Sequence, residues 1–141
     1  MKYLIIILLF FSLNVSAQKW QIPALYAGSV IFNGIGDGLN DNGQKGWGHF
    51  SNAVSVSLLV VSPLIADYNK NKWWIKYPIS YGFIRAGVFD PAYNLSRGLP
   101  VTYIGNSSLW DKFLQELNPP DGFMFGRAVF FTIGFSIPFK I

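Results

Sequence analysis

Long apolar stretches alternate with short polar ones along the chain. The most marked is a run of 21 residues without a formal charge, from Gly46 to Ala66. A helix of about 20 mostly apolar residues is long enough to cross the hydrocarbon core of a bilayer. The pattern predicts three main apolar helices, at residues 20–35, 47–66 and 73–89.

A short amphipathic segment and a C-terminal apolar segment complete the pattern. Ser108 and Asp111 have the spacing of a capping box, and the helix that they start has one broad apolar face over residues 108–117. Such a short helix cannot cross a bilayer, so we expect it to lie along the membrane surface. Residues 123–139 are mostly apolar, and both a helix and a strand fit them.

Alternation of apolar and polar residues over 73–83 and 131–141 is also typical of transmembrane strands. The smallest barrel has eight strands of about 10 residues each, or about 80 residues before any turn. The polar stretches 36–46 and 90–106 and the helix-plus-turn at 107–121 leave too few residues for those turns. The sequence therefore predicts an all-α fold, a small helical membrane bundle with three or four apolar helices plus an interfacial helix. The alternative is a small outer-membrane β-barrel.

Two stretches rich in helix-breaking residues predict loops. Residues 34–48 read GIGDGLNDNGQKGWG, and clustered Gly, Asn and Asp are typical of loops. Asp90 and Pro91 are predicted to close the third apolar segment, because proline ends or kinks a helix. Residues 95–106 are predicted to be an extended loop.

The composition favours a lipid environment over water. Hydrophobic residues make up 51% of the chain and charged residues only 13%, against about 25% charged in soluble domains. Residues 1–17 combine a charged start, a short apolar core and small residues ending at Ala17, which predicts a cleaved signal peptide. We therefore expect an exported protein, with residues 18–141 as a single domain embedded in a membrane of a bacterial-type cell envelope.

The remaining counts exclude several function classes. The chain has no cysteine, so disulfides, thiol catalysis and thiolate metal sites are excluded. The net charge of +4 comes from scattered basic residues, and we predict no nucleic-acid partner, no metal and no cofactor. The expected partners are membrane lipid, a second copy of the chain or another envelope protein.

The only histidine of the chain belongs to a short motif. His49-Phe50-Ser51-Asn52-Ala53 resembles the His-x-Ser-Asn stretch of the outer-membrane lipid A deacylases, in which His activates Ser for attack on an ester. The resemblance implies a lipid-modifying ester hydrolase that uses His49 and Ser51. On a helix these two residues would point to different faces, so the pair requires a strand.

A second resemblance favours the helical interpretation. His49-Phe50, followed by Arg85, Asp90 and Asn94, resembles the VanZ-like small helical membrane proteins. These often have His-Phe at the start of one helix and an Arg…Asp…Asn series at the end of a later one. The resemblance implies a helical membrane fold and no established reaction.

Arg85 is the most unusual charged residue, because it interrupts an apolar segment, where charge is costly and usually faces a partner or a water-filled cavity. We predict a polar cluster of Arg85, Asp90 and Asn94, reached by His49, with Asn52 as the hydrogen-bond neighbour of His49. Two interpretations stay open: an ion pair that holds helices together, and a lipid-phosphate site in which Arg85 binds two oxygens. The function expected from these features is a non-enzymatic structural, lipid-binding or assembly role, and the ester hydrolase is the alternative.

Overall fold

The computed structural model describes residues 18–65, 73–105, 112, 115–116 and 123–139. This part of the chain is helical and contains no strand, which confirms the all-α prediction. The elements are α2 (Gln18–Asp41), α3 (Lys45–Leu64), α4 (Trp73–Arg97), α6 (Phe123–Ser136) and the 3₁₀ turn η2 (Ile137–Phe139).

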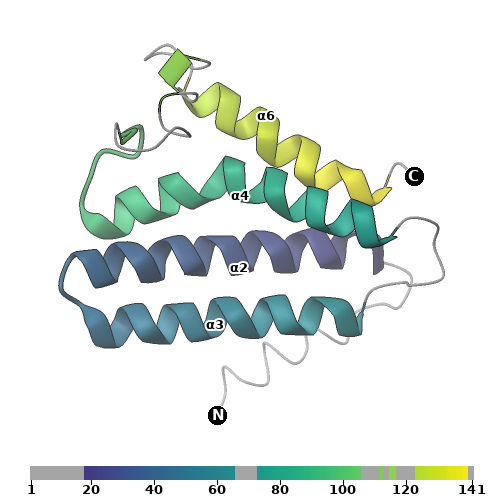
Figure 1. Cartoon of the computed structure of the whole chain (residues 1–141), viewed down its shortest axis with the longest axis horizontal. Helices are drawn as coiled ribbons and strands as arrows, with labels where there is room; N and C mark the ends of the chain where they lie inside the picture. The colour runs from purple at the N-terminus through teal and green to yellow at the C-terminus, as the bar shows by residue number, and fades with distance from the viewer. Residues whose placement is uncertain (1–17, 66–72, 106–111, 113–114, 117–122, 140–141) are drawn as a thin grey trace.

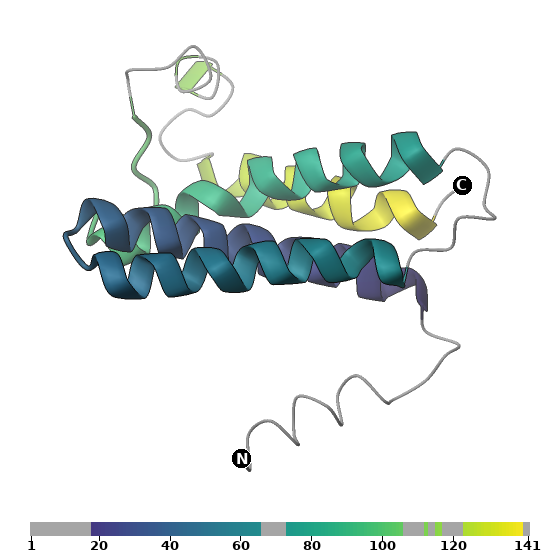
Figure 2. The ribbon, with the colours of Figure 1, turned by 60° about the horizontal axis from the view of Figure 1, so that its bottom comes forward.

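The helices lie side by side in the order α3, α2, α4, α6 (Figure 1). A short turn returns α3 antiparallel to α2, whereas α4 runs parallel to α2 on its other side, and α6 runs back along α4 (Figures 1 and 2). The apolar core is small and lies between α2 and α4. Its buried members are Ile22, Tyr26 and Val30 of α2 and Ile84 of α4.

The glycine-rich stretch 34–48 is helical, so its prediction as a loop was wrong. Only the three residues between Asp41 and Lys45 form the turn, in which Gly43 takes a φ of +81°. Gly46 is exposed, whereas the remaining four glycines, Gly34, Gly36, Gly38 and Gly48, lie close to a neighbouring helix. A Cβ atom at Gly34 would lie 2.6 Å from the Phe89 carbonyl oxygen of α4. Close packing against a neighbouring helix therefore outweighs the poor helix propensity of glycine.

Helix α4 also continues where an end was predicted. It passes through Asp90 and Pro91 and ends at Arg97, so the following loop begins at Gly98, whose φ is +80°. The residues after the proline pack against α2, where Gly38 leaves room for the Tyr93 backbone. This packing explains why a proline with a cost of about 3 kcal/mol is tolerated inside the helix.

The two alternating segments are not strands. Residues 73–83 belong to α4, and the described part of 131–141 belongs to α6 and η2. The predicted signal peptide at 1–17 and most of the predicted interfacial helix at 108–117 lie outside the described residues. Of the helices that the structure describes, none combines the length and the mean hydropathy needed to cross a membrane.

Candidate functional site

The two residues of the ester-hydrolase motif do not come together. Both lie on α3, where Ser51 is buried and only 6% exposed, whereas His49 is exposed. Residues two apart on a helix point in directions about 200° apart. The helix therefore provides no geometry in which His49 could take a proton from Ser51.

Arg85 instead joins a polar network that links three helices. Its Nη1 donates a hydrogen bond of 2.7 Å to Asn33 Oδ1 of α2. The Asn33 amide nitrogen lies 3.2 Å from Asn52 Oδ1 of α3 and 3.4 Å from Asp37 Oδ2. Asn52 completes the set by donating to Asp37 Oδ1 at 3.0 Å. We call Asn33, Asp37, Asn52 and Arg85 the three-helix network.

The three-helix network depends on helix spacing. Asn33 and Asp37 are four residues apart on α2 and so lie on the same face, one turn apart. Gly36 faces α3, because a Cβ there would lie 2.6 Å from Asn52 Cγ. The glycine brings the Asn52 amide close to α2. Each partly buried amide then has partners, as such groups require.

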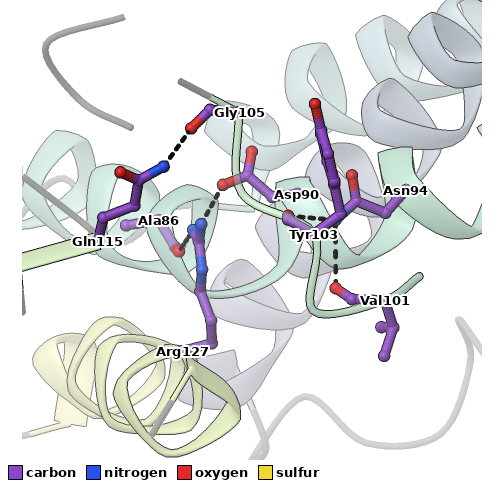
Figure 3. Close-up of polar contacts among 8 residues, drawn as sticks. All are labelled: Ala86, Asp90, Asn94, Val101, Tyr103, Gly105, Gln115 and Arg127. Atoms are coloured by element: carbon purple, nitrogen blue, oxygen red, sulfur yellow. Dashed lines mark hydrogen bonds and ion pairs between the residues drawn. The ribbon is translucent and has the colours of Figure 1, made fainter. Parts of the chain in front are cut away.

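Asp90 pairs with a residue that the sequence analysis did not single out. Arg127 of α6 donates one hydrogen bond to the Asp90 carboxylate and another to the Ala86 carbonyl oxygen (Figure 3). The Arg127 side chain is 2% exposed and that of Asp90 is 29% exposed. This ion pair ties α6 to α4.

Asn94 stabilises the loop that follows α4, and among the described residues it shares no hydrogen-bond partner with Arg85. Its amide nitrogen donates to the Val101 carbonyl oxygen at 3.2 Å and to that of Tyr103 at 2.8 Å (Figure 3). Farther along the loop, the Gln115 amide donates to the Gly105 carbonyl oxygen at 2.9 Å. Of the predicted cluster, Asn94 thus has a structural role of its own.

Arg85 and Asp90 do meet at one hollow, although each has a different partner. The hollow has a volume of about 290 Å³. Its lining consists of Gly82, Arg85, Ala86, Phe89 and Asp90 of α4 and Arg127 of α6. The Arg85 guanidinium lies over the Phe89 ring, 4.0 Å from the ring centroid. The attraction between a cation and an aromatic face helps to hold the guanidinium at this place.

Three residues of these clusters were missed by the sequence analysis: Asn33, Asp37 and Arg127. Asp37 was assigned to a loop, and that assignment hid its four-residue spacing from Asn33. Arg127 interrupts the apolar segment 123–139 as Arg85 interrupts 73–89, so the same argument about the cost of charge would have found it. Within the described residues, no group of three or more His, Asp or Glu side chains is arranged to hold a metal.

A third polar cluster lies where α2 and α4 end. The Tyr93 hydroxyl donates to the Asp41 carboxylate and accepts a hydrogen bond of 2.6 Å from Arg97 Nη1. Burial raises the pKa of Tyr93 above its ordinary value of 10.0, and the hydrogen bond to Asp41 adds to the rise, whereas Arg97 lowers it. The folded state therefore favours the protonated phenol.

This shift predicts a loss of stability in alkali. A group whose pKa is raised on folding contributes stability below its unfolded pKa, near 10, and loses it as the pH rises through the folded pKa. We expect Tyr93→Phe to flatten the fall in the free energy of unfolding above this pH. Denaturant titration at several pH values measures it, with Tyr103→Phe as the exposed control. Equal alkaline slopes in native protein and Tyr93→Phe would refute the assignment.

Comparisons with protein-family models, with curated proteins and with solved structures find no match to this chain.

Proposed function

We propose that this chain is a non-enzymatic protein of a bacterial-type cell envelope, exported by its N-terminal signal and embedded in lipid through its apolar helix faces. The distribution of side chains on α3 carries this proposal. Every residue that α3 buries is small: Gly48, Ser51, Ser55 and Ser62. Val54, Leu58 and Val61 are half-buried, and its other large apolar side chains are exposed: Trp47, Phe50, Val56, Leu59, Val60 and Leu64.

This distribution is the reverse of that in a water-soluble helix, which buries its large apolar side chains. In lipid, small residues at the interface let helices approach closely, and apolar side chains face the acyl chains. The α2–α3 contact has this character: Ser29 Oγ and Ser55 Oγ are 3.1 Å apart and buried. In water, an apolar surface of this kind would favour association or aggregation.

The other helices extend the apolar surface. Their exposed large side chains include Ile31 and Phe32 of α2, Trp74 and Ile79 of α4, and Phe125 of α6, which is 75% exposed. The charged and amide groups of the three-helix network bond to one another between the helices, and Arg127 pairs with Asp90, whereas other charged groups, such as Arg97 and Asp41, are exposed. Inward-facing, mutually paired polar groups are what a lipid environment requires. These features support a structural or lipid-binding role, with membrane lipid as the partner.

Spin labelling tests the proposal directly, because the chain has no native cysteine. Single labels at Val60→Cys and Leu64→Cys would report on the apolar face of α3, and Lys45→Cys on the same helix is the polar control. In lipid vesicles we expect the first two labels to be more accessible to oxygen and less accessible to a polar nickel complex than the control. Equal, water-like accessibility at all three positions would contradict the proposal.

A further inference from the structure

The hollow beside α4 contains more positive than negative charge. Two guanidinium groups, Arg85 and Arg127, and one carboxylate, Asp90, line it. Asp90 is already bound by Arg127. The Arg85 guanidinium donates instead to the neutral amide of Asn33 and also lies over the Phe89 ring. The lining therefore has a formal charge of +1, and this charge resides on Arg85.

Arg85 keeps donor capacity beyond these contacts. A guanidinium has five N–H donors in a planar fork, and the hydrogen bond to Asn33 uses Nη1 alone. The Phe89 ring, 4.0 Å from the guanidinium carbon, holds the fork beside the hollow through a cation–π contact. A partly buried guanidinium without a carboxylate in direct contact is costly in an apolar surrounding unless an anion neutralises it.

The size and the entrance of the hollow fit a small oxyanion. A volume of about 290 Å³ exceeds that of a phosphate group with several waters, since each water takes roughly 30 Å³ in the liquid. Gly82 is exposed and lies on the lining, and a Cβ built on it meets no atom within 4 Å. The lining is thus open at this glycine.

We propose that this hollow binds a phosphate group, with the Arg85 fork as its donor, beside the Arg127–Asp90 ion pair that lines the facing side. Arginine matches phosphate oxygens in bidentate geometry. The single excess positive charge matches the single negative charge of a phosphodiester, which is the chemistry of a phospholipid headgroup; free phosphate shares this chemistry. The proposal deepens the lipid-binding function proposed above and rests on it for the source of the phosphate.

Two glycines allow a test that leaves every charge in place. Gly82→Leu adds a bulky side chain to the lining of the hollow, and Gly46→Leu is the matched control, because Gly46 is also exposed, helical and open to an added Cβ. Binding is measured with the full chain in two arms. One arm is flotation with vesicles of digalactosyldiacylglycerol, a lipid without phosphate, alone and mixed with phosphatidylglycerol. The other arm is titration with inorganic phosphate in an uncharged detergent.

We expect the native chain to prefer the phosphatidylglycerol vesicles or to bind inorganic phosphate. Gly82→Leu should weaken that binding about tenfold, the loss expected for a charge-assisted hydrogen bond, and Gly46→Leu should not. An effect in the vesicle arm alone identifies a lipid headgroup as the source, and an effect in both arms identifies the phosphate group itself. Equal binding by Gly82→Leu and Gly46→Leu, or binding of neither probe by the native chain, would overturn the proposal.

A charge substitution tests whether the loss of binding depends on Arg85 and not only on the bulk of the new leucine. Arg85→Gln should weaken binding as Gly82→Leu does, and Arg97→Gln, which removes an exposed charge from the same helix, should not. If both arginine variants weaken binding equally, general surface charge explains the preference and the hollow is not the site. A native chain that enters neither kind of vesicle contradicts the proposed membrane function. One that enters both kinds equally and binds no inorganic phosphate contradicts only the phosphate site.

Discussion

Replacing Arg127 with methionine is expected to lower the free energy of unfolding by about 3 kcal/mol, the lower end of the range for breaking a buried ion pair from one side. The variant leaves the Asp90 carboxylate without its cation and the Ala86 carbonyl oxygen without that donor. The Arg127 side chain is 2% exposed, so water cannot take its place easily, whereas Asp90 is 29% exposed and recovers part of its hydration. Methionine keeps a long, flexible side chain, so the loss reports mainly on charge.

A double-mutant cycle measures the pair itself. Asp90→Asn alone should also destabilise, and the double variant Arg127→Met/Asp90→Asn should lose less than the sum of the two single losses, by at least about 1 kcal/mol. The matched control is the exposed pair of Arg97 and Asp41, whose atoms are 3.9 Å apart and whose side chains are 43% and 51% exposed. Arg97→Met should cost no more than about 1 kcal/mol. Denaturant unfolding followed by circular dichroism gives all these values, and strictly additive losses at Arg127 and Asp90 would contradict the coupling.

The helical character of the apolar segments could be predicted from the sequence, but the C-terminal ends of α2 and α4 could not. Gly34 and Gly38 indicate a loop when they are taken with the Asn and Asp residues around them. The same spacing of four residues also marks a helix-crossing face. Whether such glycines form a loop or a helix crossing depends on whether another helix packs against them. Here α4 packs against them, at Phe89 and Tyr93. Pro91 was misinterpreted for the same reason, since the packing that keeps the helix intact lies on another segment.

The candidate site could likewise be predicted only in part from the sequence. Arg85 could be identified from the sequence because charge inside an apolar segment is costly wherever the helix packs. Its contacts could not be predicted. Asp90 is near Arg85 in the chain, yet Asp90 bonds to Arg127 from α6, whereas Arg85 bonds to Asn33 from α2. Which helices are neighbours depends on the whole bundle, and no local pattern contains that information.

The close approach of α2 and α4 leads to the second large effect, which is expected for Gly34→Leu. A Cβ at this position would lie 2.6 Å from the Phe89 carbonyl oxygen, 3.0 Å from Ala92 Cβ and 3.1 Å from the Tyr93 backbone nitrogen. Two of these three atoms belong to the backbone, so a rotamer change cannot relieve the clash and the helices must separate. We expect a loss of about 3 kcal/mol, the upper end of the usual cost of overpacking.

Two control substitutions are expected to raise the free energy of unfolding rather than lower it. Gly46→Ala and Gly82→Ala add a Cβ where no atom lies within 4 Å. They should therefore stabilise the chain by up to about 1 kcal/mol through helix propensity alone. Denaturant unfolding measures all three variants. Spin labels at Phe32→Cys of α2 and Leu95→Cys of α4, both exposed positions, measure the separation of the two helices.

In Gly34→Leu the distance between these labels should lengthen, because the added side chain acts at the crossing of α2 and α4. An unchanged label distance together with unchanged stability would mean that α2 and α4 do not cross at Gly34. A destabilised variant with an unchanged distance would mean that the strain is absorbed inside one helix. The longer distance is specific to a backbone contact between helices, and a loss of helix propensity would not produce it. This measurement thus separates the packing role of the glycine from its conformational freedom.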